Sequence, residues 1–133
     1  MNTHATALDN GDVVRRHVLG TEHVDRSMAQ ASQFARPMQE LVTEYCWGAV
    51  WSRPGLDLRV RSLLNLAMLT ALNRPHELEL HLRGALNNGA TPSEIQEVLL
   101  QAAIYCGVPA AMDAFRTAET VLEQSGYDLN DPS

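Results

Sequence analysis

Lysine is absent from the chain, and all ten of its basic residues are arginines. Without a side-chain amine, the protein has no group for Schiff-base chemistry, for attaching pyridoxal phosphate or for a P-loop. Arginine suits a different task, because its planar guanidinium can hold a carboxylate through two parallel hydrogen bonds. The basic side chains are therefore suited to carboxylate ligands.

Aromatic residues are also scarce, at 5% of the sequence, so a core must be built from Leu, Ala, Val and Met. That composition favours helices over sheets. With 45% apolar residues in a chain of 133, we expect one domain, 1–133, with a modest core. The net charge of −6 argues against nucleic-acid and anionic-membrane partners, because both require a cationic surface.

Cysteine is limited to Cys46 and Cys106, which form no C-x-x-C motif. We expect two buried free thiols in a reducing compartment. The first 17 residues lack the apolar segment of a signal peptide, and no apolar run approaches the roughly 20 residues of a membrane span. These features predict a cytoplasmic protein.

The hydrophobic pattern predicts an all-α domain without strands, internal repeats or linkers. We expect helices at residues 5–19, 21–33, 37–51, 56–73, 75–88, 92–105 and 109–124, followed by a frayed tail over 125–133. The clearest start is a capping box formed by Thr91 and Glu94, with Pro92 at the first helical position. The second half of the 56–73 helix is apolar on nearly every side, apart from Asn65 and Thr70. We therefore expect it to be buried all round and to meet another subunit.

A row of functional side chains follows one side of the 75–88 helix. Arg74, Glu77, His81 and Gly84 recur at steps of three and four, which places them on neighbouring turns of one face. The simplest interpretation is an exposed Glu77–His81 pair on a solvated face, with Arg74 at the helix start. A metal site is disfavoured, because two ligands without an H-E-x-x-H or Cys/His cluster do not complete a set.

Other candidates have equally simple structural interpretations. Arg83 and Arg61 could face a pocket, or they could be solvated or ion-paired surface charges. Trp47 and Trp51 are spaced i,i+4, which is typical of core or interface packing.

Three long runs resemble the carboxymuconolactone decarboxylase family. They are "RPMQELVTEYCWGAVWSRPGLD", "RSLLNLAMLTALNRPHELELHLRGALNNG" and "EIQEVLLQAAIYCGVPAAMDAFR". The resemblance covers about residues 15–122 and is strongest to the members that act on γ-carboxymuconolactone itself. It implies an all-helical, alkylhydroperoxidase D-like bundle of six or seven helices. It also implies assembly into a ring-like homo-oligomer, usually a hexamer.

The redox members of this fold family carry C-x-x-C-x-x-x-H on the corresponding helix. Here His81 matches the histidine, while Arg74 and Glu77 occupy the two cysteine positions. The dithiol is missing, so peroxide reduction by thiol exchange has no nucleophile at this place.

The resemblance implies cofactor-independent decarboxylation of γ-carboxymuconolactone (4-carboxymuconolactone) to β-ketoadipate enol-lactone and CO2. This step belongs to the protocatechuate branch of the β-ketoadipate pathway. His81 is then the proton donor or oxyanion partner, and Glu77 orients it or relays the proton. The substrate carboxylates would be bound by Arg74, and further by Arg83 or Arg61. The pocket would be lined by Trp47 and Tyr45.

Two alternatives stay open at this point. One is a peroxide-detoxifying relative that uses thiols, against which the missing C-x-x-C argues. The other is a non-catalytic binding module that keeps only the fold.

Overall fold

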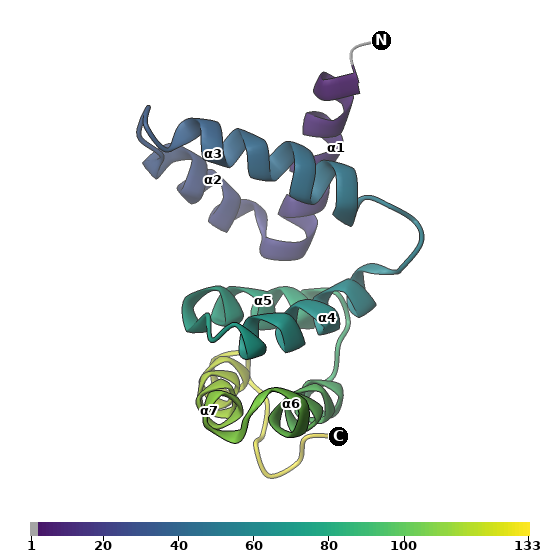
Figure 1. The fold of residues 1–133 in the computed structure, drawn as a ribbon, viewed down its shortest axis with the longest axis vertical. Helices are drawn as coiled ribbons and strands as arrows, with labels where there is room; N and C mark the ends of the chain where they lie inside the picture. The colour runs from purple at the N-terminus through teal and green to yellow at the C-terminus, as the bar shows by residue number, and fades with distance from the viewer. Residues whose placement is uncertain (1–2) are drawn as a thin grey trace. The chain divides into compact units, whose positions relative to one another are not determined.

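The computed structural model describes residues 3–133, in which helices are joined by short turns and loops and no β-strand occurs (Figure 1). The elements are α1 (Thr3–Leu19), α2 (Thr21–Gln30), α3 (Arg36–Leu41), the π-helix η1 (Val42–Trp51), α4 (Leu58–Ala71), α5 (Pro75–Asn87), α6 (Pro92–Cys106) and α7 (Val108–Gln124). The all-α prediction is confirmed. Among these residues, no helix combines the length and apolar character needed to cross a membrane.

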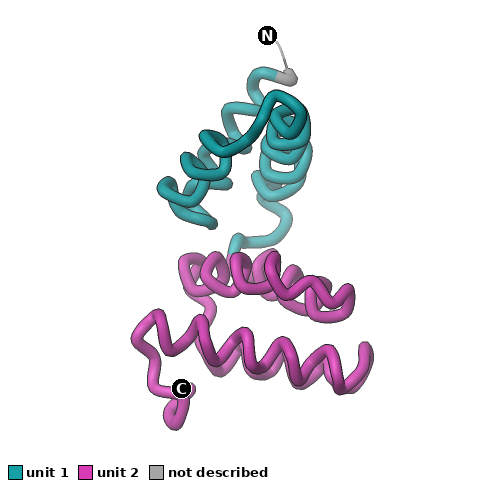
Figure 2. Tube along the Cα trace, turned by 90° about the vertical axis from the view of Figure 1, so that its left-hand side faces the viewer, with its two compact units in different colours: residues 1–58 teal, residues 59–133 magenta. Residues whose placement is uncertain are grey.

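The helices form two compact units, which Figure 2 shows in different colours. Unit 1 holds residues 1–58 and therefore α1, α2, α3 and η1. Unit 2 holds residues 59–133, with nearly all of α4 and the whole of α5, α6 and α7.

In unit 1, α1 packs along η1 through an unusually close backbone contact. A side-chain carbon added at Gly11 would overlap the carbonyl oxygen of Thr43, and one added at Gly48 would overlap that of Ala7. Only glycine permits backbones to approach this closely. The contact brings Trp47 into the core of this unit.

The structure divides the helix predicted at 37–51 into α3 and the π-helix η1. The hydrophobic pattern could not distinguish them, because π-helices share the dihedral region and much of the composition of α-helices. The Thr43 hydroxyl donates to the backbone carbonyl of Gln39 at 2.7 Å, at the junction between the two elements.

Unit 2 is organised around a core that all four of its helices supply. Its buried members include Leu66 of α4, Leu82 of α5, Leu99 of α6 and Val121 of α7. Within this unit α5 and α6 both pack against α7. As predicted, α5 begins at Pro75 and is followed by Gly89, whose φ of 90° is the left-handed conformation that ends many helices.

The capping box at the start of α6 is confirmed in both of its hydrogen bonds. The backbone N–H of Glu94 donates to the Thr91 hydroxyl at 3.1 Å, and the Thr91 N–H donates to the Glu94 carboxylate at 3.0 Å. Pro92 occupies the first helical position, where no N–H is needed. Local signals at this point were sufficient to predict the element boundary.

After α7 the chain turns back on unit 2, and the predicted fraying of residues 125–133 stays a prediction. Gly126 has a φ of 87°, and the Tyr127 N–H donates back to the Leu122 carbonyl at 3.0 Å. This turn reverses the chain and lets Leu129 pack against the core of unit 2. A single apolar residue beyond a glycine cap was too weak a signal to reveal this packing.

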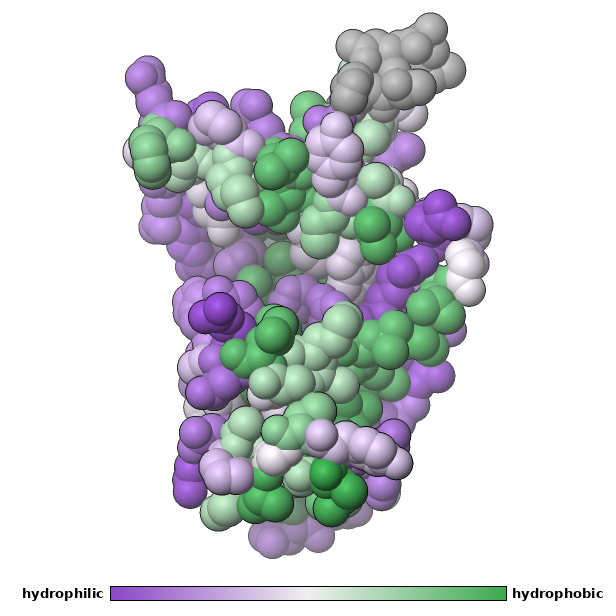
Figure 3. Space-filling model, viewed as in Figure 1, coloured by the Kyte–Doolittle hydropathy of each residue, from purple (hydrophilic) through white to green (hydrophobic). Residues whose placement is uncertain are grey.

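In a single chain the fourth helix keeps one exposed side, so its expected burial on every side requires another subunit and stays a prediction. Leu64 is 46% exposed, Met68 52% and, just after α4, Leu72 65%. Their spacing of four residues makes one apolar stripe, and Figure 3 shows hydrophobic side chains over α4.

Candidate active site

His81 lies at the centre of the predicted row and contacts α4. It is half-buried on α5, and its Nδ1 is 3.3 Å from the amide Nδ2 of Asn65. Three residues before Asn65 on α4, the Ser62 hydroxyl accepts a hydrogen bond of 2.8 Å from the side-chain amide of Asn88, which follows α5. Ser62 is fully buried, so polar contacts continue from the interior of unit 2 toward His81. Asn65 was visible in the sequence only as a polar interruption of an apolar helix.

Glu77 and Arg74 are exposed at the start of α5. Among the described residues, neither side chain forms a hydrogen bond or an ion pair, and Glu77 does not bond to His81. Glu77 lies in the first turn of α5, where a carboxylate interacts favourably with the helix dipole. Asn65 thus contacts the His81 ring, and an orienting role of Glu77 stays a prediction. The Arg74 guanidinium is available to a ligand.

The structure separates the other two arginine candidates. Arg83 donates from Nη2 to the Glu79 carboxylate at 3.1 Å and to the Gln124 side chain at 2.5 Å. Residues two apart on a helix do not share a face, so Arg83 points away from the row of His81. Arg61 is half-buried on α4, one residue before Ser62.

Trp47 and Tyr45 belong to unit 1, whereas the other candidates belong to unit 2. Trp47 is 3% exposed and packs with Val18 and Trp51 in the core. The two indole rings are 4.7 Å apart between centroids and tilted by 32°. Within its unit, Trp47 therefore has the packing role expected of an i,i+4 pair. Tyr45 is half exposed on the same helix.

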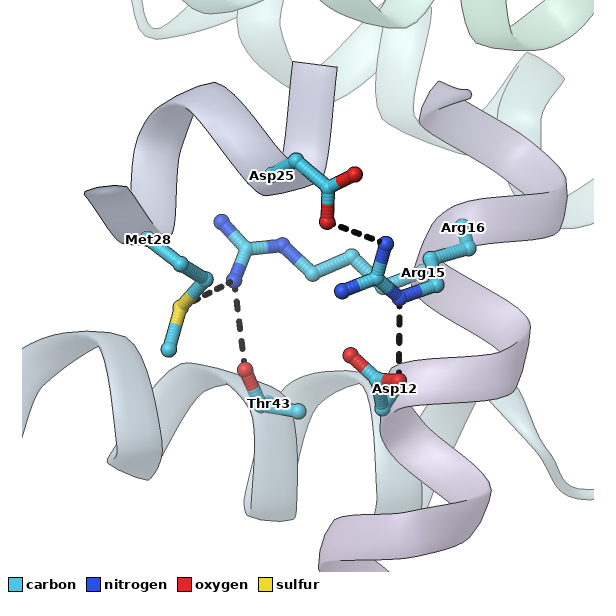
Figure 4. Close-up of polar contacts among 6 residues, drawn as sticks. All are labelled: Asp12, Arg15, Arg16, Asp25, Met28 and Thr43. Carbon is cyan, nitrogen blue, oxygen red and sulfur yellow. Dashed lines mark hydrogen bonds and ion pairs between the residues drawn. The ribbon is translucent and has the colours of Figure 1, made fainter. Parts of the chain in front are cut away.

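The sequence pattern missed one buried cation, Arg15 on α1, which is only 6% exposed (Figure 4). Its guanidinium donates to the Thr43 hydroxyl at 3.2 Å and to the Gln39 side chain at 2.9 Å, both neutral acceptors. The nearby carboxylates of Asp12 and Asp25 instead pair with Arg16, at 2.9 and 2.7 Å. Burial lowers the pKa of Arg15 from its usual value, and the charge of Asp12 partly offsets this.

A spacing signal for Arg15 was nevertheless present. Gly11, Arg15 and Val18 follow i, i+4 and i+7, which marks the buried face of α1.

The two cysteines are free, as expected, but both are exposed residues, so the prediction that they are buried is wrong. Cys46 lies on η1, and Cys106 ends α6 beside an apolar groove of about 340 Å³. Cysteine is usually buried because it behaves as a small hydrophobe, a tendency that says nothing about an individual helix face. In the described part of the chain, no three His, Cys, Asp or Glu side chains gather as metal ligands would.

The geometry thus brings together a half-buried imidazole, an amide that contacts it and, seven residues earlier at the start of α5, an arginine with no partner in residues 3–133. A guanidinium can hold a carboxylate, and an imidazole can donate a hydrogen bond or a proton. This set is suited to a small anionic ligand that undergoes a reaction involving charge development or protonation.

Comparison with known proteins agrees with this chemistry. Residues 36–120 match the Carboxymuconolactone decarboxylase family. The chain is 50% identical to a nitrosuccinic acid decarboxylase of Metarhizium robertsii, over 93% of this chain and 90% of that protein. It is 43% identical to a 4-carboxymuconolactone decarboxylase of Acinetobacter baylyi, over 85% of this chain and 84% of that protein. An uncharacterized 15.0 kDa protein of Paracoccus denitrificans is 35% identical over 65% of this chain and 71% of its own length.

The family match spans well over half of the chain and crosses the boundary between the two units. The relatives with named activities cover most of both sequences. On this evidence, the chain belongs to the carboxymuconolactone decarboxylase family.

Proposed function

We propose that this protein decarboxylates 4-carboxymuconolactone to β-ketoadipate enol-lactone and CO2 without a cofactor. The observation that most supports this substrate is the 43% identity to the Acinetobacter enzyme over 85% of the chain. The reaction would place the protein in the protocatechuate branch of the β-ketoadipate pathway. The row of Arg74, Glu77 and His81 supplies the side-chain types that the chemistry requires.

The proposed substrate carries its own electron acceptor. When the carboxylate on the saturated ring carbon leaves as CO2, the electron pair of the broken C–C bond moves through the ring C=C into the lactone carbonyl. The resulting dienolate takes up one proton next to the carbonyl and becomes the enol-lactone. The protein therefore has to hold two carboxylates, stabilise an oxyanion and allow delivery of one proton.

Each task has a candidate residue in this proposal. Arg74 holds a carboxylate, preferably the acetate arm, because a tight grip on the departing carboxylate would stabilise the ground state and oppose the reaction. His81 serves the dienolate oxygen or delivers the proton. Glu77 remains a candidate for relaying that proton. Arg61, Trp47 and Tyr45 are further candidates for lining the substrate.

A second candidate substrate is nitrosuccinic acid, because the Metarhizium relative is 50% identical to this chain over 128 residues. This compound is also a small dicarboxylate. Its nitro group lies on the carbon that loses CO2 and can accept the electron pair, just as the lactone carbonyl does. Both substrates therefore require a carboxylate grip and an oxyanion partner. The side chains of the row do not discriminate between them.

The decisive experiment offers both compounds to the same metal-stripped preparation. 4-Carboxymuconolactone would be generated enzymatically, and CO2 release and enol-lactone formation would be followed directly. We expect kcat/KM for the lactone to exceed that for nitrosuccinic acid by at least about tenfold, as a difference of 1.4 kcal/mol in transition-state binding produces. The reverse ratio would move the assignment to nitrosuccinic acid. Failure with both would contradict both assignments and leave a binding module as the alternative.

We further propose that the two units form one family domain, 1–133, and that the protein assembles into a ring-like homo-oligomer, as a hexamer. The exposed stripe of Leu64, Met68 and Leu72 supports this, since scattered apolar residues are normal but contiguous ones mark contacts. Multi-angle light scattering tests the assembly. A monomeric mass at working concentration would contradict it.

A further inference from the structure

Asn65 and His81 form a contact whose direction is set by chemistry. The Asn65 Nδ2 atom lies 3.3 Å from Nδ1 of His81. An amide nitrogen only donates hydrogen bonds, so Nδ1 has to accept and cannot carry a proton in this arrangement. In a neutral imidazole, the proton then resides on Nε2. The contact thus favours one of the two tautomers.

We propose that Asn65 is a positioning residue that holds neutral His81 in its Nε2–H tautomer. His81 then acts as a hydrogen-bond donor to the oxyanion of the reaction. This inference rests on the proposed function for its catalytic consequence, but the tautomer is a property of the free protein. It narrows the role of His81 from proton donor or oxyanion partner to oxyanion partner.

The position of Asn65 on α4 places its side chain beside α5. It is half-buried on α4, a helix whose neighbouring positions are largely apolar. One turn earlier on α4, fully buried Ser62 accepts a hydrogen bond from Asn88, which follows α5. Two polar contacts, Asn65–His81 and Ser62–Asn88, therefore connect α4 to α5 and the residue that follows it. The contact at fully buried Ser62 opposes sliding of the two helices. A fixed register keeps Asn65 beside His81.

The chemical consequence follows from the donors involved. A neutral imidazole with its proton on Nε2 donates from that atom and presents no base there. An imidazolium would instead carry a second N–H on Nδ1, directed at the Asn65 amide hydrogens. The contact therefore favours the neutral ring over the charged one. Preorganised donors of this kind act on charge that develops in the transition state.

The test is a spectroscopic measurement on the full-length protein without substrate. Protein labelled with 15N-histidine is studied at about pH 8, where ordinary imidazoles are neutral. Long-range 1H–15N correlations distinguish a protonated ring nitrogen from an unprotonated one, and the His81→Gln spectrum identifies the His81 signals. We expect an unprotonated Nδ1 and a protonated Nε2. A protonated Nδ1 in the wild-type protein would overturn the proposal.

Two substitutions extend the test. Asn65→Asp replaces the donor by an acceptor of the same shape, so we expect the proton to move to Nδ1. Gln96→Glu introduces the same charge on an exposed part of α6 and should leave the His81 spectrum unchanged. If Asn65→Ala and Asn65→Asp both retain the wild-type tautomer, Asn65 does not set it.

An activity measurement separates this proposal from the proposed function. With whichever acid the wild-type protein turns over, Asn65→Asp should lower kcat by about 10²-fold, as loss of one oxyanion donor does. KM should change little. A wild-type protein inactive on both acids would contradict the proposed function and leave the tautomer result standing. A turnover unchanged by Asn65→Asp, with the tautomer reversed, would overturn the catalytic role of the tautomer.

Discussion

The Nη1 group of Arg15 donates to the hydroxyl of Thr43 across 3.2 Å, and that hydroxyl donates in turn to the Gln39 carbonyl at 2.7 Å. A buried cation thus connects α1 to α3 and η1 through neutral partners, of which Figure 4 shows Thr43 on η1. Such an arrangement is costly, because a buried charge that is hydrogen-bonded only to neutral groups loses its hydration with little Coulombic return.

The first prediction concerns the stability of unit 1. Arg15→Met retains much of the side-chain volume and removes the buried charge, so we expect its free energy of unfolding to lie within about 1 kcal/mol of wild type. Arg15→Ala also leaves a cavity and unmatched acceptors, and it should destabilise by about 2–4 kcal/mol. Urea unfolding followed by tryptophan fluorescence is a suitable measurement, because both tryptophans lie in unit 1. Equal losses in the two variants would show that the hydrogen bonds outweigh the desolvation cost.

A second prediction concerns the close crossing of α1 and η1. Gly11→Ala and Gly48→Ala would each force a methyl group into a backbone carbonyl of the facing helix. Overpacking against a side chain costs about 1–3 kcal/mol, and a backbone group yields less, so we expect losses at or above that range. Gly55→Ala is the matched control, because nothing lies within 4 Å of its added carbon. A loss at Gly55 as large as those at Gly11 and Gly48 would contradict the packing argument.

A third prediction tests which arginine holds the substrate. Arg74→Ala should raise KM by roughly 10- to 100-fold, because a hydrogen-bonded charge pair contributes about 1.5–3 kcal/mol. Arg116→Ala is the control, since Arg116 is exposed on α7 and pairs with Asp113 at 2.6 Å. Steady-state kinetics with the preferred acid provide both constants. If Arg83→Ala raises KM and Arg74→Ala does not, the carboxylate role belongs to Arg83, despite its contacts with Glu79.

Local signals predicted the fold well where they were strong, as at the capping box of Thr91 and in the row leading to His81. Contacts between distant segments were not accessible in the same way. His81 contacts Asn65, 16 positions away, and Asn65 has no sequence feature beyond its polarity in an apolar helix. Arg15 is buried by packing of α1 on η1, which its own helix pattern only suggests. The side-chain types of the site could thus be predicted, whereas their partners depended on tertiary packing.

The last prediction concerns Cys46, an exposed residue whose thiol is partly desolvated. This desolvation raises the pKa of the Cys46 thiol above its ordinary value, although the charge of Arg15 and a hydrogen bond with Trp51 lower it in part. In a Cys106→Ala background, alkylation of the folded protein should therefore have a pH midpoint above that of the same thiol unfolded in urea.

The same shift makes stability depend on pH, because the pKa of the Cys46 thiol is higher in the folded state than in the unfolded state. The thiol's contribution to stability is present below its unfolded-state pKa and is lost as the pH rises through its folded-state pKa. Cys46→Ala should consequently lose less stability than the parent between neutral pH and pH values above the thiol's ordinary pKa of about 8.5. Equal midpoints in folded and unfolded protein would contradict the raised pKa, and a lower midpoint in the folded protein would make the charge of Arg15 the dominant influence on the thiol.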